Sequence, residues 1–358
     1  MNTTPLTPLG PLATPVFAAD DVVVIGTSTG GIDALRIVLG GLPLQFPAAV
    51  LVVMHIGSHD SILPSLLAGA TQLPVRHARD GDILEPGRVL VAPPDRHLLL
   101  QRDGDRARVA LAHGPRENHA RPAIDPLFRS AAAAFGARAT AVILTGMLDD
   151  GTAGLQAIKE CGGKAVVQLP EDAFAADMPA SALRHVEVDH VLRLPQIAAM
   201  LDRIVGDSLV AARNAPRQVP DWIRLENRFA AGSADMDSLA KFGTPSTFTC
   251  PECHGSLWEL HGLVPRRYRC HTGHAYTEKV LADHQCQAVE ESLWAALRAL
   301  QEKERLLRQM ADEAIASGHA GTAVDYVEQA AQAQRSGEVL RRLLTAAQDG
   351  TDTFVKQP

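Results

Sequence analysis

The sequence lacks any apolar run long enough to span a lipid bilayer, so we expect no membrane insertion. Its first twenty residues contain no Lys or Arg and no continuous apolar core, which argues against a secretory signal peptide. The same stretch contains several Pro and Thr residues, and we predict that residues 1–20 form a disordered arm.

Positive charge and cysteine are also scarce. The 358 residues include 34 Lys and Arg against 41 Asp and Glu, which gives a net charge of −7. An acidic chain of this kind argues against nucleic-acid binding, which needs positive charge facing the phosphates. Five cysteines in a chain of this size, without an export signal, are expected to be reduced or metal-bound rather than paired in disulfides. We therefore predict a cytoplasmic protein that binds no nucleic acid.

The sequence does contain a regular alternation of strand and helix patterns. Continuous apolar runs such as residues 48–54 (AAVLVVM) are typical of strands that are covered on both faces. Asp103-Gly104 lies between two short strand patterns and predicts a hairpin. We expect an α/β fold with a doubly wound, mostly parallel sheet and one antiparallel hairpin insertion. The predicted strands are residues 22–25, 48–54, 88–92, 98–101, 108–111, 140–145, 164–168 and 190–194, and the predicted helices are residues 32–42, 61–70, 125–135, 152–161 and 195–204.

The stretch Val22–Gly31 (VVVIGTSTGG) indicates a strand, a tight turn and the start of a helix. Gly26-x-Ser28-x-Gly30 fits a strained turn that presents a serine hydroxyl at the carboxyl end of a strand. The helix that follows would point unpaired N–H groups at an oxyanion formed there. Glycine-rich turns at this place also begin dinucleotide and phosphate sites, although Ser28 occupies the second glycine position of that fingerprint. A purely structural turn is a third alternative.

Three residues with matching chemistry follow predicted strands. Ser28 follows the first strand, His55 the second, and Asp149 and Asp150 follow the strand at 140–145. Carboxyl ends of parallel strands meet at one edge of a sheet, where sites form. An imidazole there could take the serine proton, and a carboxylate could orient the imidazole. Spacing alone does not choose between Asp149 and Asp150. The order Ser, His, Asp disfavours an α/β-hydrolase, in which the acid precedes the histidine.

From Val22 to about Val205 the chain resembles the catalytic domain of CheB-type protein-glutamate methylesterases, the chemotaxis receptor methylesterases. The stretches that carry this resemblance are VVVIGTSTGG, the strand ending in His55, VAPPDRH at 91–97, RPAIDPLF at 121–128 and VILTGMLDDGTAG at 142–154. The resemblance implies that Ser28, His55 and Asp150 are catalytic. It also implies that the backbone N–H groups of Thr29 and Met147 stabilise the oxyanion.

The implied reaction is hydrolysis of γ-glutamyl methyl esters on a methylated chemoreceptor-like protein, with release of methanol and possible accompanying glutamine deamidation. No cofactor is implied for catalysis. Members of this family often carry an N-terminal receiver domain, whereas here only a short arm precedes the first strand, so we expect control by a kinase or a separate response regulator. The alternatives are a non-catalytic signalling adaptor that retains the methylesterase fold and a nucleotide-binding α/β domain.

A second candidate site lies further along the chain. Cys250-x₂-Cys253 is followed after sixteen residues by Cys270-x₃-His274, a spacing typical of a structural Cys₃His zinc site. His254 and His271 are alternative ligands to His274. Reduced thiols packed in a helical tail are the alternative to a metal site. A small segment of this kind has little core of its own, so zinc would supply part of its folding energy.

These patterns predict five parts of the chain. We expect a disordered arm at 1–20, the methylesterase-like domain at 21–205, a linker at 206–245, a zinc knuckle at 246–284 and a helical hairpin at 285–348. One short helix is expected in the linker, around Trp222 to Phe229. Apolar residues at helical spacing predict the hairpin, and Gly318 is expected to separate its two helices. We expect this C-terminal module to bind a partner.

Overall fold

The computed structural model describes residues 19–57, 59–104, 106–210, 218–234 and 236–354. Residues 1–18 of the predicted arm therefore lie outside the described residues. The chain divides into two compact units, Met1–Leu281 and Ala282–Pro358. Within the described ranges, no helix combines the length and the apolar character needed to cross a membrane.

The first unit is built around a seven-stranded parallel sheet with the strand order β3-β4-β2-β1-β7-β8-β9. Its strands are β1 (Val22–Thr27), β2 (Ala49–Met54), β3 (Val75–His77), β4 (Val89–Val91), β7 (Ala139–Ile143), β8 (Lys164–Gln168) and β9 (His190–Leu192). The central strand, β1, pairs with β2 on one side and β7 on the other. The three strands that precede Ser28, His55 and Asp150 are thus immediate neighbours.

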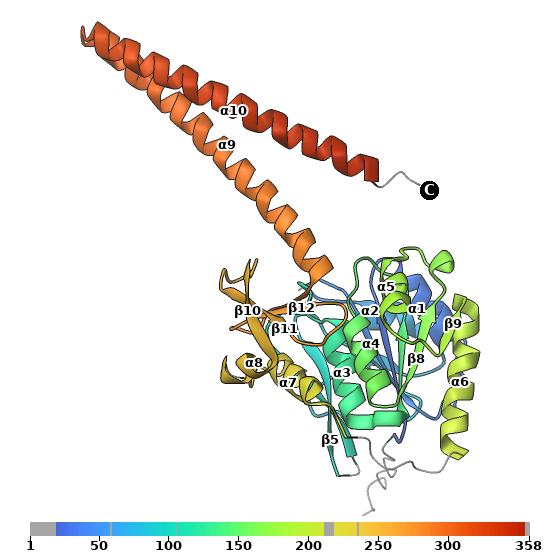
Figure 1. Cartoon of the computed structure of the whole chain (residues 1–358). Helices are drawn as coiled ribbons and strands as arrows, with labels where there is room; N and C mark the ends of the chain where they lie inside the picture. The colour runs from blue at the N-terminus through green and yellow to red at the C-terminus, as the bar shows by residue number, and fades with distance from the viewer. Residues whose placement is uncertain (1–18, 58, 105, 211–217, 235, 355–358) are drawn as a thin grey trace, which may run out of the picture. The chain divides into compact units, whose positions relative to one another are not determined.

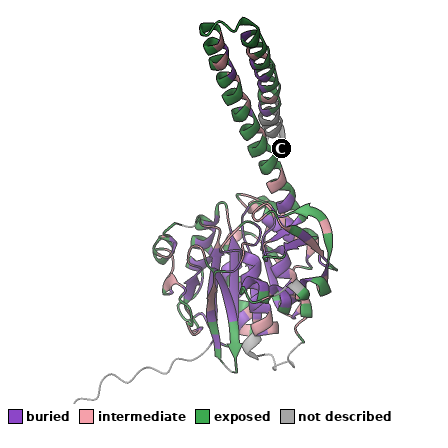
Figure 2. Ribbon diagram, turned by 90° about the vertical axis from the view of Figure 1, so that its left-hand side faces the viewer, coloured by how far each residue is buried: buried purple, intermediate pink, exposed green. Residues whose placement is uncertain are grey.

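Both faces of the sheet are covered by helices, because successive side chains of a buried strand point to opposite faces. Val22 and Val24 of β1 belong to the core under α3, α4 and α5, whereas Val23 and Ile25 belong to the core under α1, α2 and α6. Figure 2 shows buried strands within the sheet, and the central strands β1, β2 and β7 are almost entirely buried. The helices are α1 (Gly31–Gly40), α2 (Leu63–Ala68), α3 (Ile124–Phe135), α4 (Thr152–Glu160), α5 (Asp177–His185) and α6 (Leu194–Val210), with 3₁₀ turns η1 (Gly136–Arg138) and η2 (Pro170–Asp172).

The predicted doubly wound fold with one antiparallel insertion is confirmed. The insertion consists of β5 (His97–Asp103) and β6 (Arg106–Ala112), which pair with each other and not with the large sheet. β5 packs on α3. Within residues 21–205, the strand β3 and the helix α5 were not predicted, because β3 has only three residues and α5 only nine.

Residues 218–281 pack onto the same unit. The segment predicted as a linker contains α7 (Asp221–Ala230), which packs on α3, and α8 (Met236–Phe242). An antiparallel sheet follows, formed by β10 (Gly243–Thr249), β11 (Ser256–Leu260), β12 (Arg267–Cys270) and β13 (Ala275–Thr277). The cysteine- and histidine-rich segment is therefore a small sheet.

The second unit is an antiparallel helical hairpin, as predicted, formed by α9 (Glu278–Ala316) and α10 (Ala320–Phe354) (Figure 1). α9 begins in the first unit. The backbone of Gly318 adopts φ +79°, and its N–H donates to Ile315 O, so the chain reverses at the predicted glycine. Small side chains such as Ala311, Ala323 and Ala330 are buried in the hairpin, while several larger apolar side chains are exposed.

Candidate active site

The turn after β1 presents Ser28 at the carboxyl edge of the sheet. Gly30 adopts φ +77°, a left-handed conformation that glycine accepts at little cost, and α1 begins at the next residue. The Ser28 N–H donates to the carbonyl of Thr145 (3.0 Å), which ties the turn to the segment that follows β7. A Cβ added to Gly146 would clash with Met178 Sδ and would lie 3.0 Å from the Cβ of Ser28, so glycine gives this segment room between the two side chains.

Ser28, His55 and Asp150 form a continuous hydrogen-bonded line. Nδ1 of His55 lies 3.1 Å from Ser28 Oγ, and Nε2 lies 2.7 Å from Asp150 Oδ2. An ionised carboxylate can only accept a hydrogen bond, so Nε2 carries the ring proton and Nδ1 is left to accept the serine proton. The three side chains that the sequence predicted to meet at this edge do so, although 95 residues separate His55 from Asp150.

Asp150 is 2% exposed, and its carboxylate accepts several hydrogen bonds. The donors are His55 Nε2, Ile124 N, Asn118 Nδ2, Asp125 N and Gly151 N. Burial alone would raise the pKa of Asp150, but the hydrogen bond and charge of His55, with the donors from Ile124 and Asn118, hold this pKa below its ordinary value. The carboxylate is therefore kept ionised and fixed in direction.

Asp149 faces away from this line. Its Oδ1 accepts a hydrogen bond from Thr277 Oγ1 (2.7 Å), and burial raises the pKa of its carboxyl group. The sequence pattern left the two aspartates open, and the resemblance favoured Asp150. In the structure, Asp150 contacts His55, whereas Asp149 contacts Thr277 of the strand β13.

Two backbone N–H groups remain available beside Ser28. Among the described residues, neither Thr29 N nor Met147 N has a hydrogen-bond acceptor. The carbonyl of Thr29 and the hydroxyl of Thr145 are joined (2.9 Å), which brings the two predicted donor segments together. Met147 is 57% exposed, so this side of the serine is open to a substrate.

Comparison with known proteins agrees with this geometry. A family model described as CheB methylesterase matches residues 23–201, half of the chain. A relative from Leptospira interrogans is 39% identical over 190 residues, and the alignment covers 53% of this chain and 97% of the relative. The chain belongs to the CheB methylesterase family. The predicted family and its class of activity, carboxylic ester hydrolysis, are thereby confirmed.

Other CheB relatives are longer than the matched part. A protein from Xanthomonas oryzae pv. oryzae is 40% identical over 177 residues, which make up 49% of this chain and 50% of that protein. The crystal structure of the Thermotoga maritima CheB methylesterase catalytic domain superposes with a TM-score of 0.51 and 35% sequence identity. The match covers 52% of this chain and 98% of the Thermotoga domain. The names of both the Leptospira and the Xanthomonas relatives combine protein-glutamate methylesterase with protein-glutamine glutaminase.

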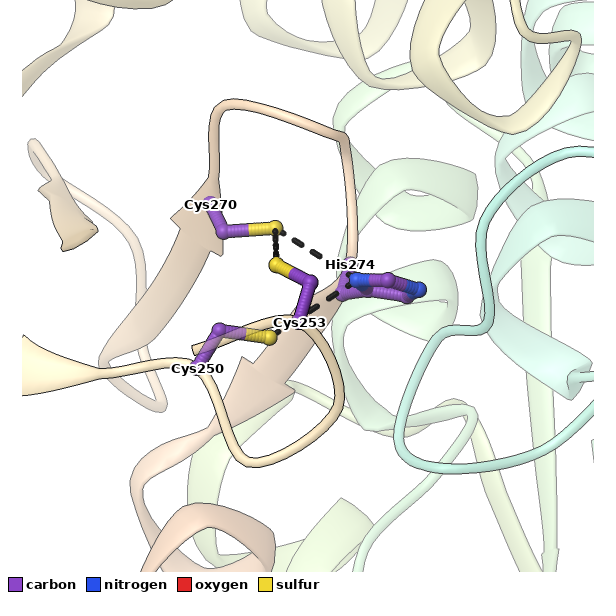
Figure 3. A group of neighbouring side chains, drawn as sticks. All are labelled: Cys250, Cys253, Cys270 and His274. Carbon is purple, nitrogen blue, oxygen red and sulfur yellow. Dashed lines mark hydrogen bonds between the residues drawn. The ribbon is translucent and has the colours of Figure 1, made fainter. Parts of the chain in front are cut away.

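Beyond the part matched to the CheB family, the four predicted metal ligands lie together (Figure 3). Cys250 and Cys253 lie between β10 and β11, whereas Cys270 ends β12 and His274 precedes β13. Their ligand atoms all lie within 4.8 Å of one another. Among the described residues, the cluster contains His274 and neither of the alternatives His254 and His271. The other two cysteines, Cys161 and Cys286, are not part of it.

The spacing of these atoms fits a tetrahedral zinc site. Zinc–sulfur bonds of about 2.3 Å place the sulfur atoms of a tetrahedron about 3.7 Å apart. Cys253 Sγ and Cys270 Sγ are 3.6 Å apart, and Nδ1 of His274 lies 3.5 Å from Cys270 Sγ and 3.7 Å from Cys250 Sγ. Nε2 of His274 faces Glu252 Oε2 at 3.3 Å, the carboxylate partner that orients many metal-binding histidines. The donor set and its surroundings therefore suit zinc.

The sequence did not point to Asn118 or to a buried charge cluster beside it. Asn118 donates to Asp150 Oδ1 (2.9 Å) and to Asp125 Oδ2 (3.2 Å). The members of the cluster, each with side chains at most 2% exposed, are Glu117, Asp125, Arg129, Glu226, Arg267 and Arg269. These residues come from three distant stretches of the chain. Spacing in the sequence carries no signal for such a cluster.

Proposed function

We propose that this protein is a protein-glutamate methylesterase that hydrolyses γ-glutamyl methyl esters on a chemoreceptor-like protein. The observation that carries this proposal is the line Ser28–His55–Asp150 at the carboxyl edge of the sheet, with contacts of 3.1 and 2.7 Å. Membership in the CheB family and the names of the relatives support the ester as the substrate.

In the proposed reaction, Nδ1 of His55 takes the proton of Ser28 as Oγ attacks the ester carbonyl. Asp150 stabilises the imidazolium through Nε2. When the tetrahedral intermediate collapses, the imidazolium gives its proton to the departing methoxide, so methanol leaves and an acyl-serine remains. A water molecule then loses a proton to His55 and attacks the acyl group, and the proton returns to Ser28 as the glutamate carboxylate departs.

The N–H groups of Thr29 and Met147 would receive the negative charge of the carbonyl oxygen. Both groups lack an acceptor among the described residues, and the start of α1 adds the positive end of a helix dipole. Removal of one such donor typically costs about 10²–10³-fold in turnover.

The same attack on a glutamine side chain would release ammonia in place of methanol. Because the combined names of the relatives include glutaminase, glutamine deamidation forms part of the proposal.

We also propose that Cys250, Cys253, Cys270 and His274 hold a structural zinc ion, which would stabilise the small sheet in which they lie. The fit of the ligand distances and the contact of His274 with Glu252 support this assignment. Zinc would take no part in the ester chemistry, for which no cofactor is proposed.

In this proposal the enzyme acts in the cytoplasm on the helical cytoplasmic segment of its receptor, under control of a kinase or a separate response regulator. The hairpin of α9 and α10 would bind such a partner. Its exposed apolar residues support a binding role, and among them are Val289, Trp294, Val324 and Val339.

Two measurements on the purified protein test the esterase. We expect methanol release from a methylated receptor and covalent labelling of Ser28 by a fluorophosphonate probe. Ser28→Ala should abolish both. Ser65→Ala, an exposed serine in α2, is the matched control and should change neither. Methanol release by Ser28→Ala at the rate of the unmodified protein would reject the assignment. A wild-type protein that folds but releases no methanol would favour the signalling adaptor.

A further inference from the structure

The loop that carries Asn118 is an extra edge of the cysteine- and histidine-rich sheet. Asn118 N donates to the carbonyl of Ala275 (2.8 Å), and Ala275 N donates to the carbonyl of Arg116 (3.2 Å). Glu117 thereby forms a bridge with Ala275 of β13. Residues 116–118 precede α3 in the esterase domain, so a strand 159 residues later in the chain fixes their backbone position.

The Asn118 side chain connects this sheet to the catalytic carboxylate. Its Oδ1 accepts a hydrogen bond from Thr277 N (3.1 Å), and its Nδ2 donates to Asp150 Oδ1 (2.9 Å). The side chain is 7% exposed, so water competes little for these contacts. One amide thus spans β13 and the acid of the Ser28–His55–Asp150 line.

The position of β13 depends on the four metal ligands. His274 directly precedes Ala275, and Cys270 ends β12, so both ligands belong to the turn that joins the two strands (Figure 3). Cys250 and Cys253 belong to the connection between β10 and β11. A metal bound by all four would therefore fasten the β12–β13 turn to the β10–β11 turn, which lies beside it at the same end of the sheet. The apolar core beneath the sheet is small, so a metal would add to the hydrogen bond that Arg269 Nη1 donates to the carbonyl of Gly273 in this turn.

A second contact follows the same route. Thr277 Oγ1 donates to Asp149 Oδ1 (2.7 Å), so β13 also holds the residue that precedes Asp150. Glu252, between the two ligands Cys250 and Cys253, contacts both His274 and His119. His274 is thus one residue away from β13, and Glu252 links the metal ligands to the loop that carries Asn118. β13 and this loop are the two segments that orient Asp150.

We propose that zinc at Cys250, Cys253, Cys270 and His274 acts as a remote support of the esterase, with Asn118 as the positioning residue between the two sites. The inference rests on the proposed function. Zinc fixes β13, β13 fixes Asn118, and Asn118 holds the Asp150 carboxylate at the distance that His55 requires. Loss of zinc frees Asn118 and lowers turnover while the ester-binding surface stays intact.

The first test compares two cysteine variants of the full chain, Cys270→Ser and Cys286→Ser. Cys286 is exposed and outside the cluster, so its variant is the matched control. Zinc content, thermal unfolding, kcat and KM for methanol release, and the rate of fluorophosphonate labelling of Ser28 are measured on each. We expect Cys270→Ser to lose zinc, to label more slowly and to lose about tenfold or more in kcat with little change in KM, the scale usual for a lost supporting partner. Cys286→Ser should match the wild type.

A second variant keeps the test decisive if Cys270→Ser does not fold. Asn118→Ala leaves all four ligands in place, so it should retain zinc and lose about tenfold in kcat, with KM little changed. Full kcat in Asn118→Ala, or in zinc-free Cys270→Ser, would overturn the inference and leave the esterase standing. A wild-type protein that is purified without zinc and binds none when zinc is added would also overturn the inference and leave the esterase standing. Absence of methanol release from the zinc-loaded wild type would instead overturn the proposed function and the inference with it.

Discussion

Nη2 of Arg267 lies 3.2 Å from Oε2 of Glu117, although 150 residues separate them in the chain and neither side chain is exposed. Arg129 and Arg269 contact the same carboxylate. Removing charges from water costs several kcal/mol per ion, so such a cluster persists only where opposite charges face one another. The pair therefore joins β12 to the loop before α3, and the small sheet to the esterase domain, through buried charge.

Replacement of Glu117 by Gln should destabilise the first unit. Three buried guanidinium groups would lose their shared carboxylate, and breaking a buried ion pair from one side typically costs about 3–5 kcal/mol. Urea unfolding followed by far-UV circular dichroism measures the loss. Asp207→Asn removes an exposed partner of Arg203, with side chains 79% and 76% exposed, and should change the free energy of unfolding by less than about 1 kcal/mol. Equal stability of the Glu117→Gln variant and the wild type would contradict the importance of the cluster.

Asp125 should make stability depend on pH. Burial raises the pKa of its carboxyl group to about 7, partly opposed by the charge of Arg267 and reinforced by that of Asp150. In the unfolded chain this pKa is near 3.8, so between about pH 4 and pH 7 the native state binds the extra proton. Stability from this group is therefore present at low pH and lost as the pH rises through 7. Relative to Asp125→Asn, the wild type should lose free energy of unfolding from about pH 4 to about pH 7. A difference between the two proteins that stays constant over that range would count against the raised pKa.

Asp150 and Asp149 should respond very differently to the same substitution. In Asp150→Asn the amide nitrogen can donate a hydrogen bond to Nε2 of His55. The ring proton then sits on Nδ1, so Nδ1 can no longer accept the proton of Ser28. We expect kcat to fall by about 10⁴-fold. Asn at position 149 can still accept the hydrogen bond of Thr277, so Asp149→Asn should cost less than about tenfold. Steady-state methanol release measures both, and a larger loss at 149 than at 150 would reverse the assignment.

Phe174 should contact the protein substrate. Phe174 is 81% exposed. A Cβ added to Gly30 would lie 2.7 Å from the Cβ of Phe174, so the phenylalanine lies over the turn that carries Ser28. Burial of a phenylalanine is worth about 1.5–3 kcal/mol, so Phe174→Ala should raise KM for a methylated receptor at least tenfold and leave the melting temperature unchanged. Leu44→Ala removes an apolar side chain that is 61% exposed before β2, at the opposite edge of the sheet, and serves as control. If both variants had the same KM, Phe174 would have no part in binding.

Much of the first unit could be predicted because its signals are local. A buried parallel strand needs an apolar run, and residues 48–54 supply one that matches β2 (Ala49–Met54). β3 has only three residues, with no side chain fully buried, and so gives no such signal. In the segment 206–245, α7 buries Ile223 and Phe229, but it is also fixed by Glu226, whose partner Arg269 lies 43 residues away and gives no local signal.

By itself, the sequence determined the alternation of strands and helices, the turn that exposes Ser28 and the spacing of the four metal ligands, since each depends on residues close together in the chain. Only the tertiary structure decided that Asp150 rather than Asp149 faces His55, and that Asn118 joins this acid to β13. Which of two adjacent side chains turns inward depends on the hydrogen-bond donors that other segments supply. Those donors meet only when the sheet brings distant parts of the chain to one edge.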